Sequence, residues 1–415
     1  MERLKHFLPS FDRRIWWILL GYTVSLIGTG MTEPYLIIYL HHIRNISLTL
    51  SGIIIGSSGL AGVIAIPTAG LLNNWIRTKQ IFIFSLFLGS LGRLLFALSI
   101  NEKIAICAAI VSGAATAASW NALSLILSLS VAKSQKSSIF GVAFALQNLG
   151  SGLGAMLGSV LVRSQSTRSF QLIFILDAVT FIIFALFSEK WVMNISTRTV
   201  TSQRKKHMYL FSDHIIKNDY KILIFLSSCY ALFAIVMTGV STTLFPQWAI
   251  VQAHVSLQVI GDAFLINSLT ILAAQLPSLQ WIKRTRRTRV IAFAALLFTV
   301  GYIVMLIAGF LKSECSALAL ILSFAVTAFG EIFLFSSLPA LVNDLVRGKI
   351  KNHFNSVING AWQIGSIFGP ILAGSGLTLH LAIPLFLGYI FILMLLIPSL
   401  IFLETLIPIE LNRDT

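Results

Sequence analysis

The chain alternates long apolar runs with short turns that are polar and mostly basic. A helix needs about 20 apolar residues to cross the hydrocarbon core of a membrane, and about twelve runs reach that length. The predicted spans are residues 15–40, 49–73, 80–100, 104–131, 137–163, 168–189, 220–249, 256–282, 289–311, 315–345, 352–377 and 380–406. The pattern therefore predicts an all-α membrane protein with twelve transmembrane helices.

The two halves of the chain repeat each other. Residues 66–81 (IPTAGLLNNWIRTKQI) resemble residues 276–291 (LPSLQWIKRTRRTRVI) at an offset of 210, which pairs Pro67 with Pro277. Half-length repeats of membrane helices are typical of secondary transporters. We therefore predict two pseudo-symmetric six-helix bundles, residues 1–189 and 220–415. A cytoplasmic linker, residues 190–219, joins them and is too short for a core of its own.

A second repeat lies in the fifth and eleventh predicted helices, at an offset of 215. It aligns Gly150, Gly154 and Gly158 with Gly365, Gly369 and Ala373. Small residues spaced by four lie on one face of a helix and let another helix approach closely. This face is either static packing or a surface along which two bundles move.

Composition supports a membrane location. The 415 residues are 56% hydrophobic and 11% charged, whereas soluble domains carry about 25% charged residues. The formal net charge of +15 lies mostly in the turns, so it indicates topology rather than nucleic-acid binding. With the N-terminus inside, about 24 Lys and Arg fall on the inner side and about 5 on the outer side. We expect a multi-pass protein of the cell (inner or plasma) membrane with both termini cytoplasmic.

Motifs for enzyme chemistry are missing from the sequence. The three cysteines have no metal-ligand spacing, and there is no G-x-x-x-x-G-K-[ST] phosphate loop. We therefore expect no metal, no cofactor and no enzyme activity. The expected partners are a small-molecule substrate, protons and the lipid bilayer, without nucleic acid, and we expect a monomer.

Three stretches carry a family resemblance. They are GTGMTEPYLIIYL (28–40), LDAVTF (176–181) and FGEIFLFSSLPALVNDL (329–345). With the number of spans and the central loop, the chain resembles the major facilitator superfamily over nearly its whole length. Bacterial multidrug efflux pumps of the drug:proton antiporter branch look most similar. The resemblance implies alternating access to a central cavity lined by helices one, four, seven and ten.

The turn after the second helix is where this family places an inner gate. The family pattern is Gly, three residues, Asp, Arg, one residue, Gly and Arg. The corresponding gating turn here holds Gly70, Asn74, Arg77 and Lys79. Asn74 stands where the family has the acid, so the usual Asp–Arg charge pair is missing, although Asn74 can still accept hydrogen bonds.

Two carboxylates inside spans are candidate proton or cation sites, because such groups are costly in a membrane. Glu331 lies near the middle of the tenth helix among phenylalanines, and Glu33 lies in the outer half of the first helix, before Pro34. An apolar environment disfavours the charged form of a carboxyl group. Reversible protonation is what proton coupling needs. The alternative for each is a structural hydrogen bond to a neighbouring helix.

Three other charges have structural interpretations. We predict a link between Asp177 and Arg93, in helices that the family places away from the cavity. Asp344 is either an ordinary interfacial charge or a partner of the basic turn 283–289.

Aromatic and amide side chains inside the predicted spans suggest a substrate cavity. They are Trp120, Asn121, Gln147, Asn148, Asn359, Trp362 and Gln363. Aromatic faces with scattered hydrogen-bonding groups suit bulky amphipathic cations. The alternative is hydrogen bonding between helices.

The sequence thus predicts a proton-coupled exporter of lipophilic or cationic small molecules. A carrier of another solute in the same fold, such as a sugar, peptide or metabolite, is the first alternative. A membrane enzyme or a lipid-handling protein without solute coupling is the second. A membrane enzyme would need a clustered catalytic set at one surface, and the sequence offers none.

Overall fold

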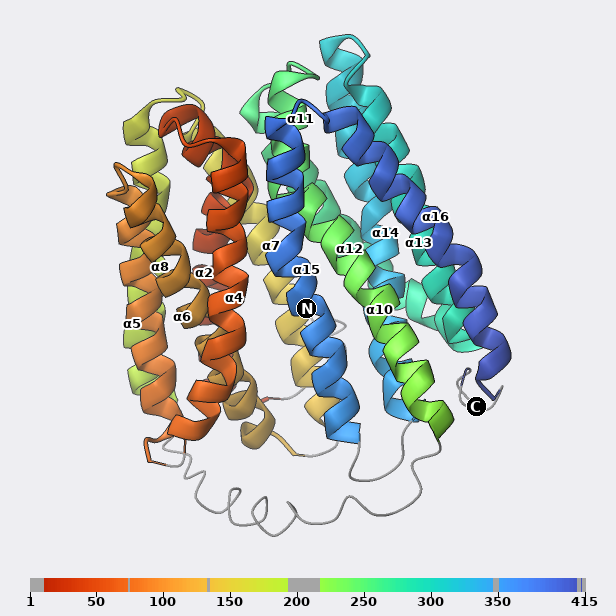
Figure 1. Cartoon of the computed structure of the whole chain (residues 1–415). Helices are drawn as coiled ribbons and strands as arrows, with labels where there is room; N and C mark the ends of the chain where they lie inside the picture. The colour runs from red at the N-terminus through yellow and green to blue at the C-terminus, as the bar shows by residue number, and fades with distance from the viewer. Residues whose placement is uncertain are drawn as a thin grey trace, which may run out of the picture. The chain divides into compact units, whose positions relative to one another are not determined.

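The computed structural model describes residues 11–73, 75–132, 135–192, 217–345, 351–408 and 412. This part of the chain is helical, without strands (Figure 1). In chain order the elements are α2 (Arg13–Thr32), η1 (Glu33–Tyr35), α3 (Leu36–Ile38), η2 (Tyr39–Ile43), α4 (Leu48–Leu72), α5 (Thr78–Ala97), α6 (Glu102–Ser130), α7 (Lys136–Leu161), α8 (Thr167–Trp191), α10 (Lys217–Gly239), η4 (Val240–Leu244), α11 (Phe245–Val251), α12 (Leu257–Arg284), α13 (Arg287–Ala308), α14 (Ser313–Leu345), α15 (Lys351–Thr378) and α16 (Ala382–Leu406).

Eleven helical segments among the described residues are long and apolar enough to cross a membrane. The remaining predicted span corresponds to α15, which has the length but carries several polar residues in its first half. They include Lys351, Asn352, His353, Asn355, Asn359 and Gln363. The prediction of an all-α membrane fold is confirmed.

The described residues form two compact units. The first unit covers residues up to Thr32, then Ser57–Gly154, and then Ser164 to the end of α8. The second unit covers Glu33–Gly56, Ala155–Arg163 and the chain from α10 onward. The units therefore divide α4 and α7 between them. The division into bundles at residues 189 and 220 stays a prediction.

The first unit has an aliphatic and aromatic core shared by five helices. Its buried side chains come from α2, α5, α6, α7 and α8, and include Leu19, Tyr22, Phe82, Leu127, Ile139 and Phe184. The Phe82 and Phe184 rings meet edge to face at 5.4 Å between centroids. This packing holds α2 in place within the unit, and α2 carries one of the aromatic groups described below.

The glycine stripes allow close packing between helices within each unit. In the first unit, a Cβ on Gly154 of α7 would lie 2.2 Å from the Ile27 carbonyl oxygen of α2. In the second, a Cβ on Gly369 of α15 would lie 2.6 Å from the Ile235 carbonyl oxygen of α10. Neither position can hold a larger residue without a backbone shift. The sequence repeat is thus a repeat of helix packing, and a moving surface stays a prediction.

Gly154 and Gly141 offer a matched test on α7, because a Cβ on Gly141 would meet nothing within 4 Å. Alanine raises helix propensity by about 1 kcal/mol at an open site, whereas overpacking costs about 1–3 kcal/mol. We expect Gly154→Ala to lower the melting temperature of the purified protein and Gly141→Ala to leave it unchanged or raise it. Equal shifts for both variants would contradict this packing account.

Candidate functional site

Glu331 lies near the middle of α14, the tenth predicted span, and is partly buried. Its Oε1 accepts a hydrogen bond of 3.0 Å from Nδ2 of Asn267, a buried residue of α12. The same Nδ2 lies 3.3 Å from the carbonyl oxygen of Phe324. Among the described residues no ion pair includes Glu331. Within the described part of the chain, the carboxyl group thus has a neutral partner and no ion-pair partner.

An aromatic group extends from Glu331 along the same face of α14. Phe335 is four residues further on, one helical turn away on that face. The Phe335 ring lies 5.5 Å from the Trp362 ring of α15, centroid to centroid. Trp362 in turn lies 5.7 Å from the Tyr230 ring of α10. We take these three rings and the Glu331 carboxyl, one helical turn from Phe335, as the candidate site; all four lie in the second unit.

The first unit has a comparable aromatic group. Tyr22 of α2 lies 5.7 Å from Trp120 of α6, with the rings nearly parallel. The Tyr22 hydroxyl donates to Oε1 of Gln147 on α7 at 3.1 Å. Gln147 and Trp362 are 215 residues apart, the offset of the glycine stripes. Each repeat thus joins a tyrosine of its first helix to its fifth helix.

Sequence reasoning missed Tyr22 and Tyr230. Both lie in apolar runs, where tyrosine is an ordinary packing residue. The available signal was that both tyrosines lie on the first helix of a repeat, 208 residues apart, which is close to the repeat offsets.

The other predicted cavity residues do not join these groups through a described contact. Asn148 donates to the Phe144 carbonyl oxygen of its own helix, and Gln363 accepts from Ser366 of its own helix. Asn121 is partly buried and Asn359 is exposed. A cavity of about 810 Å³ in the first unit is lined by other residues of α4, α5 and α6. The role of these amides therefore stays a prediction.

Glu33 lies in η1, where the α-helix gives way to a 3₁₀ turn at Pro34. Proline lacks the backbone N–H that an α-helix needs, which accounts for the change. The Glu33 side chain is exposed, whereas Pro34 and Tyr35 are buried. The Tyr35 hydroxyl donates to the Ala155 carbonyl oxygen at 2.7 Å, which fixes the turn. Glu33 is thus more open to its surroundings than Glu331.

Arg93 and Asp177 lie in contact, as the sequence analysis expects. Nε of Arg93 is 3.3 Å from Oδ2 of Asp177, and both residues are buried. The Thr32 hydroxyl donates to the same oxygen at 2.9 Å. Gly28 leaves room for the carboxylate, since a Cβ there would lie 2.7 Å from Oδ1. This ion pair links α2, α5 and α8, and its structural role stays a prediction.

The gating turn is described apart from Asn74, which lies outside the described residues. Gly70 and Arg77 are exposed. Nζ of Lys79 lies 3.3 Å from Oε1 of Glu189 at the end of α8.

The equivalent turn in the second unit has a similar arrangement. Arg289 aligns with Lys79 at the offset of 210. Nε of Arg289 lies 2.8 Å from Oε2 of Glu404 at the end of α16. Glu404 also pairs with Arg286. Arg287 pairs with Asp344 of α14, the partner that the sequence analysis offered as an alternative.

Among the described residues, no group of three or more His, Cys, Asp and Glu side chains could hold a metal ion. The chemistry available here is protonation, charge attraction and contact with aromatic faces.

The Arg93–Asp177 pair yields a test by double substitution. Removing one partner of a buried ion pair leaves an uncompensated charge and costs about 3–5 kcal/mol, whereas replacing both by apolar residues is often neutral. We expect Asp177→Leu to lower the melting temperature strongly and Arg93→Leu/Asp177→Leu to recover most of the loss. A double variant as unstable as the single one would rule out charge compensation as the cause.

The two turn acids differ in burial, which gives a second test. The Glu404 side chain is 9% exposed with several donors around it, whereas the Glu189 side chain is 66% exposed. Exposed ion pairs contribute little to stability. We expect Glu404→Gln to lower the melting temperature and Glu189→Gln to leave it almost unchanged. A larger effect at Glu189 would contradict the assignment.

Comparison with known proteins identifies the family of this chain. The family model of the Major Facilitator Superfamily matches residues 18–251 and, in a second match, residues 226–414. The chain is 22% identical over 370 residues to YqjV of Bacillus subtilis (strain 168), an uncharacterised MFS-type transporter; the alignment covers 86% of this chain and 85% of YqjV. The MFS-type transporter YdeE of Escherichia coli (strain K12) is 22% identical over 354 residues, covering 85% of this chain and 86% of YdeE.

Solved structures agree on the fold. The nucleoside transporter NupG aligns with a TM-score of 0.74 at 12% identity, covering 95% of this chain and 99% of NupG. A POT family transporter in complex with 5-aminolevulinic acid aligns with a TM-score of 0.72 at 14% identity, covering 96% and 98%. At sequence identities this low, the structural similarity supports the fold and says nothing about the substrate. With the family match over nearly the whole chain, they lead to one conclusion: this chain belongs to the Major Facilitator Superfamily and is a multi-pass membrane transporter.

Proposed function

We propose that the protein exports lipophilic or cationic small molecules by alternating access, as a proton antiporter of the drug:proton branch. In this proposal it is a monomer of the cell membrane with both termini in the cytoplasm. One proton and one substrate cation compete for the carboxyl group of Glu331.

The uncompensated carboxyl of Glu331 carries this proposal. Its described partner is the amide of Asn267, which donates to a charged or a neutral carboxyl with little difference in geometry. An unpaired carboxylate in an apolar span is costly. Binding a proton removes that cost, and so does binding a substrate cation. Either ligand therefore disfavours the other, which is the requirement for exchange.

The aromatic rings that begin one helical turn from Glu331 supply the rest of the proposed site. Phe335, Trp362 and Tyr230 present aromatic faces, which attract organic cations and bury apolar groups. Such faces are tolerant of shape, because their contacts have few directional requirements. The carboxyl group then attracts cationic substrates, and the rings bind large apolar groups. Together they suit a range of lipophilic cations.

Proteoliposomes with an imposed pH gradient test the proposal. We expect gradient-driven uptake of tetraphenylphosphonium by the wild type and uptake at the level of empty liposomes for Glu331→Gln, because the amide neither binds a proton nor attracts a cation. Glu314→Gln is the matched control, since Glu314 is an exposed acid at the start of the same helix. It should leave uptake unchanged.

Two results would contradict the proposal in different ways. Full uptake by Glu331→Gln together with lost uptake by Glu33→Gln would move the coupling proton to Glu33. Absence of gradient-dependent movement of any lipophilic cation would reject drug export and favour a carrier of another solute.

A further inference from the structure

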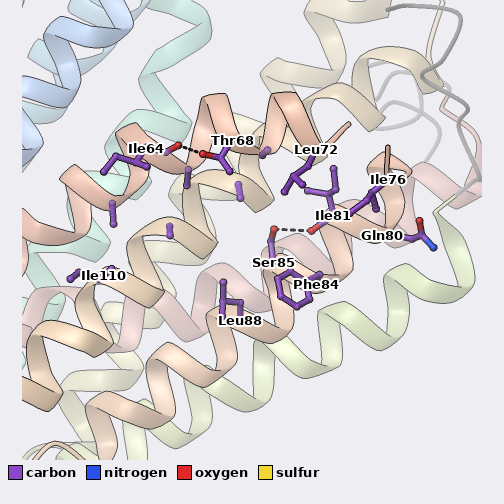
Figure 2. A pocket seen from close by; sticks show the side chains of 15 residues that line it. Ile64, Thr68, Leu72, Ile76, Gln80, Ile81, Phe84, Ser85, Leu88 and Ile110 are labelled. Atoms are coloured by element: carbon purple, nitrogen blue, oxygen red, sulfur yellow. Dashed lines mark hydrogen bonds between the residues drawn. The ribbon is translucent and has the colours of Figure 1, made fainter. Parts of the chain in front are cut away.

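A groove lies in the first unit between α4, α5 and α6. Its volume is about 810 Å³, within the range of about 300–1,000 Å³ typical of sites for small molecules. Figure 2 shows Ile64 and Ile110 at one end, Ile76 and Gln80 at the other, and Thr68 between them. The lining residues are Ala61, Ile64, Ala65, Thr68, Ala69, Leu72, Ile76, Gln80, Ile81, Phe84, Ser85, Leu88, Ile110, Ala114 and Ala118.

One end of the groove adjoins a tight contact between α4 and α6. A Cβ on Gly113 of α6 would lie 2.1 Å from the Ser58 carbonyl oxygen of α4, and one on Gly62 would lie 3.2 Å from the Ala117 Cβ. The helices therefore touch at these glycines. Along α4 the lining runs from Ala61 to Leu72 and continues to Ile76, in the turn that holds Arg77.

The lining offers almost nothing but apolar surface. The Thr68 hydroxyl donates to the Ile64 carbonyl oxygen and the Ser85 hydroxyl to that of Ile81, each at 2.7 Å within its own helix (Figure 2). The side chains of Ile64 and Phe84 are 62% and 67% exposed. An occupant of this groove must therefore be a hydrocarbon chain or a similarly apolar group.

The second unit has a three-ring contact between α12, α13 and α14, the counterparts of α4, α5 and α6 in the repeat. Trp281 of α12, Phe293 of α13 and Phe333 of α14 contact one another, with centroids 5.2–5.6 Å apart. At the offset of 210, Trp281 aligns with Leu71 and Phe293 with Ile83. The first unit thus has aliphatic side chains at these aligned positions. Leu71 and Ile83 do not line the groove, so the difference concerns the packing beside it.

A basic residue, Arg77, lies next to the end of the groove that Ile76 and Gln80 line. Arg77 is exposed and lies between Ile76 and Gln80, which both line the groove. Its backbone N–H donates to Oε1 of Gln80 at 3.3 Å. The neighbouring Trp75 is 83% exposed. Tryptophan is enriched at membrane interfaces, and basic groups between membrane helices attract anionic head groups.

We propose that this groove binds an anionic phospholipid from the adjoining leaflet. One acyl chain lies between α4, α5 and α6, and the phosphate lies beside Arg77. The positive charge of Arg77 disfavours a cationic substrate in the same place. The groove shares no residue with the candidate site at Glu331, which belongs to the other unit.

Native mass spectrometry of the full chain with added phosphatidylglycerol and phosphatidylcholine tests this proposal. Ala65→Phe and Ala114→Phe each place a ring in the groove, whereas Val63→Phe adds a ring on α4 outside it. We expect the retained phosphatidylglycerol to be lost in both groove variants and kept in Val63→Phe. Arg77→Gln should lower the ratio of bound phosphatidylglycerol to phosphatidylcholine about fivefold, because one basic contact is removed.

Three results would overturn the proposal. The first is retention of phosphatidylglycerol by both groove variants as in the wild type. The second is a wild type without preference for the anionic lipid. The third is displacement of bound phosphatidylglycerol by excess tetraphenylphosphonium, which would assign the groove to the transported substrate.

Discussion

Charge inside a membrane must be compensated, and this constraint orders the structure. The described chain meets it in two ways. Asp177 has Arg93 as an ion-pair partner and accepts a hydrogen bond from Thr32, so its charge is compensated inside the unit. Glu404 sits at a helix end among arginines. Glu331 is the contrasting case, because its described partner is the amide of Asn267. A carboxyl whose charge is not already compensated can respond to a proton or a cation.

The two repeats share their packing but differ in chemistry. In both, glycines of the fifth repeat helix lie against the first, at Gly154 and at Gly369. In both, a tyrosine of the first helix contacts an aromatic group. The Glu331 carboxyl of α14 has no counterpart in the first repeat. The equivalent helix there is α6, which has no acidic residue after Glu102. In this account the helix packing is common to both repeats, whereas proton coupling depends on Glu331, which occurs in the second repeat.

The sequence predicted the helices well, because hydropathy over a whole span depends on composition and hardly on neighbours. It also suggested the Arg93–Asp177 contact, since two buried opposite charges have few other solutions. It could not separate Tyr22 from ordinary packing residues, because the Gln147 contact joins positions 125 residues apart. The groove beside Ile64 was missed for a similar reason: aliphatic side chains line a lipid-facing helix and a groove alike.

Competition between proton and cation at Glu331 is the central claim. Its most direct measurement is proton release when tetraphenylphosphonium is added to the purified protein in weakly buffered detergent. Linkage predicts release of up to about one proton per bound cation for the wild type, at a pH where the carboxyl is protonated, and none for Glu331→Gln. Cation binding without proton release at any pH, or equal release by wild type and variant, would contradict the account.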